Sequence, residues 1–130
     1  MQAALERLAH TFYRAKDKRA ADWLEDALAQ WGIPVDLPPN YNSLATYMNS
    51  EAKGNDVRRA TLALTELRNN AVHPKKTPVP DGAYYQAWQL ARWFTELSVL
   101  SVIGYQGDYA NRLTRQVEGQ VESVPWAPTT

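Results

Sequence analysis

The sequence predicts an all-α protein, folded as a bundle of four to five helices. Apolar residues recur at steps of three and four through most of the chain, which is the spacing of one helical face. Clusters of glycine and proline separate these periodic stretches, and such clusters end helices. A strand-like alternation appears only faintly, in QVESVPW near the C-terminus. We therefore expect helices packed around one core, which a chain of 130 residues is long enough to bury.

Two amphipathic helices are expected in the N-terminal part of the chain. The first lies near residues 3–15, and its apolar face consists of Ala4, Leu5, Leu8, Phe12 and Ala15. The charged run RAKDKR at 14–19 then favours an exposed linker over a binding site. The second helix continues the period through Ala20, Trp23, Leu24, Ala27, Leu28 and Trp31. It should end at Gly32 and Pro34, because glycine accepts the left-handed cap and proline cannot continue a helix.

The middle of the chain predicts a short helix followed by a longer one. PVDLPPNYNS reads as an ordered loop that ends at an N-cap, Asn42 or Ser43, and the short helix should run from there to Gly54. Asp56 is the expected cap of the next helix. The buried stripe of that helix is expected to be Val57, Ala60, Leu64, Leu67 and Ala71. Pro74 disfavours helical geometry at the preceding residue, so this helix should finish at Val72 or His73.

The longest helix is predicted over residues 83–103. Apolar residues cover most of its circumference: Tyr84, Ala87, Trp88, Ala91, Phe94, Leu97, Val99 and Ile103. Such a helix is buried among several partners, or on one side against another chain. Trp23, Trp88, Trp93 and Phe94 lie in helical stripes, which favours core or dimer packing over base stacking. We assign residues 1–112 to the helical domain and 113–130 to a C-terminal tail.

Composition excludes several classes of function. Fourteen basic and fourteen acidic residues cancel, so no bulk positive field indicates a nucleic-acid partner. The absence of cysteine removes disulfides, thiolate zinc sites and cysteine nucleophiles, and fits a reducing cytoplasm. ELSVLSVIGY is much shorter than the roughly 20 residues that span a bilayer, so we expect a soluble protein without membrane contact. No acidic or histidine cluster and no glycine-rich phosphate loop is apparent, so we expect no metal and no cofactor.

LRNNAVHPKK, residues 67–76, is the one candidate active site. Arg68 and His73 are five residues apart, which separates them by roughly 140° on a regular helix. Asn69 and His73 are four apart and share a face. Because Pro74 loosens the helix at the histidine, the three side chains can converge. The plainer interpretation is an ordinary helix end, in which Arg68 complements the helix dipole and His73 bonds a backbone carbonyl.

These residue types suit the cleavage of RNA without a metal ion. Histidine accepts or donates a proton near neutral pH, and the arginine fork matches a phosphate and the extra charge of its transition state. Asparagine can orient either group. RNA carries its own nucleophile in the 2′-hydroxyl, so a base and a charge stabiliser suffice. Because a single histidine leaves one proton transfer unserved, we expect a homodimer that places two copies of the site face to face.

The string LRNNAVHP resembles the Arg-X4–6-His motif of the HEPN superfamily, with Arg68 and His73 at the signature positions and Asn69 at the polar one. The proline-rich turn, long apolar helix and GYQGDYANR segment make residues 4–112 similar to the Apea-like HEPN group, the C-terminal part of larger bacterial anti-phage proteins. The resemblance implies a dimeric, metal-independent endoribonuclease domain of a defence or toxin system. It also implies a further partner, such as an N-terminal sensor region or an antitoxin.

Cations near this motif predict a rim for the RNA backbone. They are Arg58, Arg59, Lys75 and Lys76. A solvated helix face and a charged turn are the alternative interpretation. Two other functions stay open: a non-catalytic module that binds nucleotide or RNA or only dimerises, and an antitoxin or scaffold in which Arg68 and His73 are structural.

Overall fold

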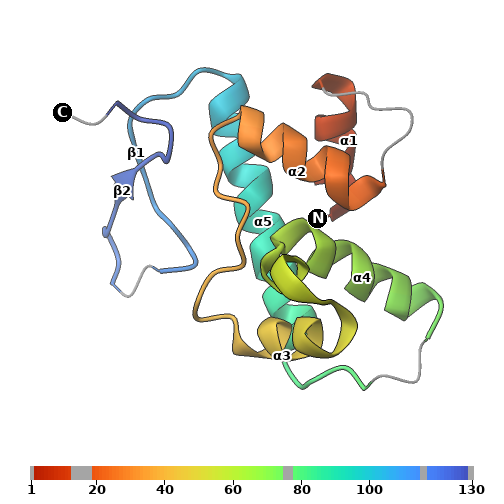
Figure 1. Cartoon of the computed structure of the whole chain (residues 1–130). Coiled ribbons are helices and arrows are strands. Elements are labelled where there is room, and N and C mark those ends of the chain that lie inside the picture. The colour runs from red at the N-terminus through yellow and green to blue at the C-terminus, as the bar shows by residue number, and fades with distance from the viewer. Residues whose placement is uncertain (1, 13–18, 75–77, 115–116, 129–130) are drawn as a thin grey trace.

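Five α-helices contain more than half of the residues that the computed structural model describes (Figure 1), which confirms the all-α prediction. The structure describes the chain except residues 1, 13–18, 75–77, 115–116 and 129–130. The elements are α1 (Gln2–Phe12), α2 (Ala20–Gln30), α3 (Asn42–Glu51), the 3₁₀ helix η1 (Gly54–Arg58), α4 (Ala60–Val72), α5 (Ala83–Val102), β1 (Asp108–Tyr109) and β2 (Glu122–Ser123). None of the helices in the described part of the chain has the length and apolarity needed to cross a membrane.

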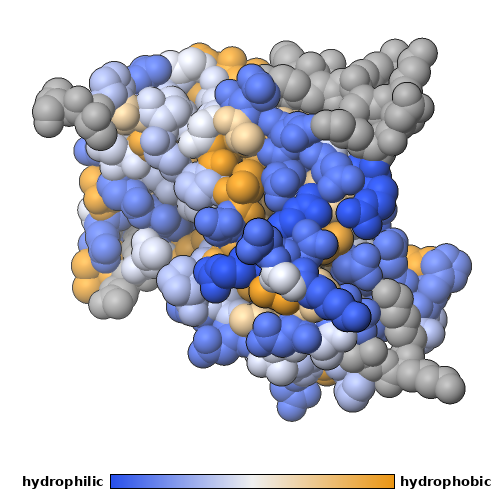
Figure 2. Space-filling model, viewed as in Figure 1, coloured by the Kyte–Doolittle hydropathy of each residue, from blue (hydrophilic) through white to orange (hydrophobic). Residues whose placement is uncertain are grey.

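Helix α5 is the centre of the bundle and contacts α1, α3 and α4. In Figure 1 it runs the length of the molecule, with α1, α2 and α4 on one side and the β1–β2 segment on the other. The side chains that are fully buried around it include Leu5, Leu24, Leu28, Tyr47, Leu64, Leu67, Phe94 and Leu97. The face of the molecule in Figure 2 is mostly hydrophilic, and hydrophobic residues gather in a narrow band near its middle.

One side of α5 is open. The sequence predicts burial around most of this helix, yet Tyr84, Trp88, Val99 and Ile103 are exposed by 48%, 46%, 46% and 68%. Burial among several partners within the chain is therefore wrong for these four positions. The apolar pattern identified residues that can pack, but it could not show which of them the other helices reach.

Helix α4 begins later than predicted, at Ala60 instead of Val57. The cause is a backbone pairing with the connection between α2 and α3. The Leu37 N–H donates to the Arg58 carbonyl oxygen at 2.8 Å, and the Ala60 N–H donates to the Val35 carbonyl oxygen at 3.1 Å. Arg59 between them is extended and becomes the N-cap, so the predicted cap at Asp56 is wrong. The far end of α4 agrees with the prediction, because the helix stops at Val72 and His73 is its C-cap.

The C-terminal residues pack back onto the helices. β2 pairs antiparallel with β1. β2 lies within QVESVPW, the stretch in which the sequence showed a faint strand-like alternation. Val124 is buried, and the Trp126 Nε1 donates to the Tyr105 carbonyl oxygen at 2.7 Å. Gly32, which ends α2 at a φ of +76°, leaves room for Trp126, whose Cβ would lie 2.8 Å from an added Cβ. Residues 122–127 thus belong to the packed structure.

Candidate functional site

Arg68 lies near the end of α4 and is held by Glu6 of α1. Its Nη1 donates to both carboxylate oxygens of Glu6 at 2.7 Å. The side chain of Arg68 is 44% exposed and that of Glu6 is 19% exposed. Within the described residues the remaining donors of Arg68, Nε and Nη2, have no hydrogen-bond partner. Glu6 therefore fixes one edge of the guanidinium and leaves the other edge open to a ligand.

Two recesses meet at Arg68. The first is a groove of about 220 Å³ between α4 and α5, and it is largely apolar. Besides Arg68, its lining consists of Leu64, Leu67, Ala71, Tyr84, Ala87, Trp88 and Ala91. The aromatic rings at its edge are the half-exposed Tyr84 and Trp88. Such a groove can accept a flat apolar or aromatic group beside a cation.

The second recess is polar and lies between α4 and the start of α2. Its volume is about 180 Å³, and Arg19, Thr65, Glu66, Arg68 and Asn69 contribute polar side chains to its wall. The wall also includes Ala20 and Ala21, the first residues of α2. The structure thus places Arg68 and Asn69 in the wall of one recess.

His73 stands apart from these recesses. It is exposed beyond the last turn of α4, and its backbone N–H donates to the Asn69 carbonyl oxygen at 2.7 Å. Its ring lines neither recess. The neighbouring Asn70 is buried and donates to the Tyr47 hydroxyl at 3.3 Å, so it serves the core. The convergence of His73 with Arg68 and Asn69 stays a prediction.

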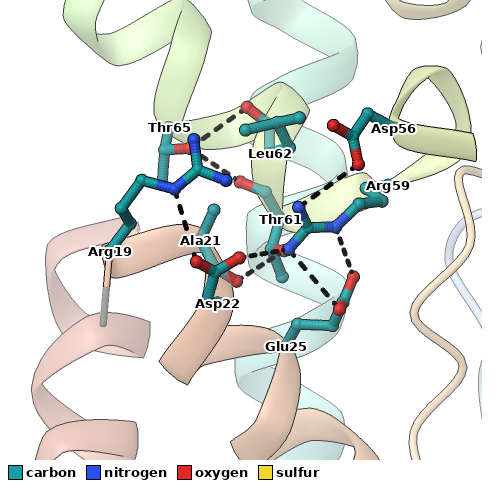
Figure 3. A network of polar contacts seen from close by, with 9 residues as sticks. All are labelled: Arg19, Ala21, Asp22, Glu25, Asp56, Arg59, Thr61, Leu62 and Thr65. Carbon is teal, nitrogen blue, oxygen red and sulfur yellow. Dashed lines mark hydrogen bonds and ion pairs between the residues drawn. The ribbon is translucent and has the colours of Figure 1, made fainter. Parts of the chain in front are cut away.

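Arg59 joins α2, η1 and α4 through a cluster of carboxylates (Figure 3). Its Nη2 lies 2.7 Å from Asp22 Oδ1, its Nε lies 3.0 Å from Glu25 Oε1, and its Nη1 lies 3.6 Å from Asp56 Oδ1. The arginine hydrogen bond lowers the pKa of Asp22, against the opposing effect of burial. Burial alone would lower the pKa of Arg59, but its bonds to Asp22 and Glu25 raise it overall. This guanidinium is only 18% exposed.

The other predicted RNA-binding cations have different surroundings. Arg58 is exposed, and its Nη2 donates to the Leu37 carbonyl oxygen at 3.1 Å. Lys75 and Lys76 lie outside the described residues. The Arg58 side chain therefore binds the connection between α2 and α3, and the Arg59 side chain binds α2 itself. A role of this rim in RNA binding stays a prediction.

Sequence reasoning missed Glu6 and Arg19, and it assigned Trp88 to packing. Glu6 is 62 residues from its partner Arg68, and no local spacing signals such a contact. Arg19 was part of a charged linker in the prediction, although it lines the polar recess. Trp88 follows the helical period of a core residue, so only its exposure in the structure shows that it borders a groove.

No metal-binding cluster accompanies these recesses. Across the described ranges, no group of three or more histidine, aspartate or glutamate side chains is placed to hold a metal ion.

Comparisons with known proteins indicate a different protein family from the one that the sequence motif predicted. The model of a family described as the YopA C-terminal domain matches residues 1–123. The SPbeta prophage-derived uncharacterized protein YopA of Bacillus subtilis (strain 168) is 26% identical over 140 residues, which cover 97% of this chain. The chain spans 30% of the length of that relative. No solved structure matches.

The resemblance to the HEPN superfamily is therefore wrong, because the matching family is that of the YopA C-terminal domain and no HEPN family matches. The reason is that an arginine, a polar residue and a histidine before proline also arise where an ordinary helix ends. Arg68 shows this, since its recorded contact is an ion pair that joins two helices.

Proposed function

The chain belongs to the YopA C-terminal domain family, and we propose that it is an RNA-binding domain that cleaves RNA without a metal ion. The observation that carries the proposal is the position of Arg68, which lines an aromatic groove on one side and a polar recess on the other. An unpaired nucleotide needs these two environments next to each other, since its base is flat and apolar and its phosphate is charged.

The groove between α4 and α5 is the proposed base site. Tyr84 offers a half-exposed ring for stacking, and the exposed part of Trp88, whose ring also contacts Tyr85 and Arg92, adds aromatic surface beside it. Stacking on aromatic side chains tolerates any base. The small side chains of Ala71, Ala87 and Ala91 keep the groove open. A volume of about 220 Å³ accommodates one base but not a duplex, so the expected ligand is single-stranded.

The phosphate is expected at the free edge of Arg68. Its Nε and Nη2 form the planar fork that pairs with phosphate oxygens, and Arg19 and Asn69 share the adjoining recess. Glu6 and Glu66 lie near these cations and offset their charge. We therefore expect modest affinity, with the stacked base contributing much of it and a shallow salt dependence.

His73 is the proposed proton-transfer residue. In the proposed reaction the 2′-oxygen attacks the neighbouring phosphorus, its proton passes to a base, and the 5′-oxygen leaves with a proton from an acid. Arg68 stabilises the charge that develops on the phosphate oxygens, and Asn69 orients the imidazole. The second proton transfer needs another group. The histidine of a facing second copy is the expectation from sequence, and Glu6 offers a carboxyl group within the same chain.

Cleavage of a labelled single-stranded RNA in EDTA tests the proposal. The wild-type chain should cut the RNA and bind, without cutting, the same oligonucleotide made of deoxynucleotides. His73→Ala should lower the rate by about 10² to 10⁴ without weakening binding to the uncleavable strand. Arg68→Ala should lose both binding and cleavage. Lys53→Ala, which removes an exposed cation elsewhere, is the matched control and should behave as wild type.

A non-catalytic module that binds nucleotide or RNA is the second candidate, because both recesses are complete without His73. Binding that depends on Arg68 but leaves the RNA intact would select this candidate. Absence of both binding and cleavage would overturn both. Since the chain matches 30% of its prophage-derived relative, we also propose that any sensor region or antitoxin of a defence system lies outside this domain.

A further inference from the structure

A stripe of exposed and partly exposed side chains runs the length of α5 and shares Trp88 with the proposed RNA site. It consists of Tyr85, Trp88, Arg92, Glu96, Val99 and Ile103. At 100° per residue these six positions fall within about 80° of one another, and they span about 27 Å along the helix. The apolar members are exposed by 46% to 68%, and contiguous exposed apolar surface of this kind marks an interaction site.

The stripe is an ordered surface. The rings of Tyr85 and Trp88 are stacked, with centroids 6.1 Å apart and planes at 20°. The guanidinium of Arg92 lies over the Trp88 ring at 5.4 Å from its centroid. Arg92 also pairs with Glu96 at 3.4 Å, and Arg112 approaches Glu96 at 3.0 Å from the side. Side chains that hold one another in this way lose less freedom when a partner binds.

The order of residues along the stripe is symmetric about the level of Phe94. Arg92 and Glu96 lie two residues before and after it, and Tyr85 and Ile103 lie nine before and nine after. Trp88 lies six before it, and Val99 and Leu100 lie five and six after it. Within the stripe, Tyr85 and Arg92 thus have Ile103 and Glu96 as counterparts at equal distances from this level, and the distances of Trp88 and Val99 from it differ by one residue.

We propose that this stripe is a self-association surface, on which the α5 helices of two copies pack antiparallel about a two-fold axis at the level of Phe94. In this arrangement Arg92 of each copy faces Glu96 of the other. The two copies of Arg92 are kept apart, and so are the two copies of Glu96. A parallel pairing would bring arginine against arginine and glutamate against glutamate. The charges therefore select a second copy of this chain in one orientation.

The shape of the surface beside α5 also favours a second copy of this chain as the partner. A groove of about 470 Å³ lies beside the C-terminal half of the stripe, between α5 and residues 109–112. Its wall includes Val99, Leu100 and Tyr109. The antiparallel pairing directs the aromatic residues of one copy toward this groove of the other. Because the contact is narrow and one helix wide, we expect a dissociation constant in the micromolar range.

The pairing also has a consequence for the RNA site. Arg68 of α4 lies beside Trp88, and Trp88 is in the N-terminal half of α5. The two-fold axis would therefore place the two Arg68 sites at opposite ends of the interface. Each site would be separate, in contrast to the facing histidines expected from the sequence.

Charge reversal with mixing tests the proposal by sedimentation velocity from micromolar to millimolar concentration. Arg92→Glu alone and Glu96→Arg alone each place like charges opposite each other twice per dimer, so each should raise the dissociation constant at least about tenfold. An equal mixture of the two variants restores opposite charges at both contacts and should associate again. Lys53→Glu changes the net charge as Arg92→Glu does, away from the stripe, and should associate as wild type.

Several results would overturn the proposal. They are a wild-type chain that stays monomeric over the whole range, an Arg92→Glu variant that associates as wild type, or a mixture that fails to recover. The relative orientation of the two α5 helices is tested separately by disulfide cross-linking. Introduced cysteines report on it cleanly because the chain has no native cysteine. Trp88→Cys mixed with Val99→Cys should form a disulfide between the two variants on oxidation. A predominance of disulfides between like variants would exclude the antiparallel arrangement.

Discussion

Replacing Arg59 by alanine should destabilise the fold without touching either proposed binding surface. The side chain makes two short charge-assisted bonds, to Asp22 at 2.7 Å and to Glu25 at 3.0 Å, and is 18% exposed. Each bond of this kind contributes about 1.5–3 kcal/mol when buried. The carboxylates are 33% and 27% exposed, so solvent screening reduces this to about 1 kcal/mol each. The contact to Asp56, at 3.6 Å and half exposed, adds little.

The expected loss is therefore about 2 kcal/mol in the free energy of unfolding. For a domain of this size that corresponds to a decrease in Tm of roughly 6–10 °C. It also corresponds to a decrease in the urea midpoint of about 1 M. Five tryptophans make intrinsic fluorescence a suitable probe of unfolding in urea at pH 7.

Arg19→Ala is the matched control, because Arg19 binds the same aspartate. Its contact with Asp22 is 3.3 Å long, and the arginine side chain is 69% exposed, so its removal should cost less than about 0.5 kcal/mol. Equal losses for the two variants would show that burial of Arg59 has no energetic weight and would refute the reasoning. A large loss of RNA binding by Arg59→Ala at unchanged stability would instead support the predicted RNA-binding rim.

Three further predictions concern the fold. Because its arginine partner lowers the pKa of Asp22, that carboxylate stabilises the fold above its unfolded-state pKa. This stability is lost as the pH falls through the folded-state pKa, so urea midpoints of wild type and Asp22→Asn should converge below about pH 4. Gly32→Ala should cost about 2–3 kcal/mol, because it combines a φ of +76° with a contact to Trp126, whereas Gly54→Ala, at +61° in open space, should cost about 1 kcal/mol. Gln86→Ala removes the acceptor of the third amide of α3 and should lower the unfolding free energy by about 1 kcal/mol, measured in the same urea titration.

The elements that the sequence predicts well are those determined by local chemistry. Gly32 and Pro34 end α2, and Pro74 ends α4, because backbone geometry at these residues excludes a continuing helix. The beginning of α4 could not be predicted in this way. It depends on hydrogen bonds from the backbone at Val35 and Leu37, which no pattern around residue 57 records.

In the candidate site, too, some features follow from local sequence and others depend on contacts between distant parts of the chain. Arg68 and Asn69 are adjacent in the sequence, so their shared recess follows from the helix itself. Glu6 reaches Arg68 only because α1 folds against the bundle, and it decides which guanidinium edge is free. The apolar period of α5 likewise predicted residues able to pack, but the exposure of Trp88 depends on where the other helices end.

The two proposed surfaces meet at Trp88, which borders the groove beside Arg68 and belongs to the stripe of α5. They therefore cannot act independently, because one face of a ring cannot stack on a base and pack against a second chain at the same time. Thermodynamic linkage then requires that RNA weakens self-association by the same factor by which self-association weakens RNA binding. Glu96→Arg tests the effect of self-association on RNA binding. Glu96 lines the groove between α5 and residues 109–112 and does not line the groove beside Arg68. At concentrations where the wild-type chain is dimeric, this variant should bind the uncleavable strand more tightly than wild type, and equal affinity would show that the two surfaces do not compete.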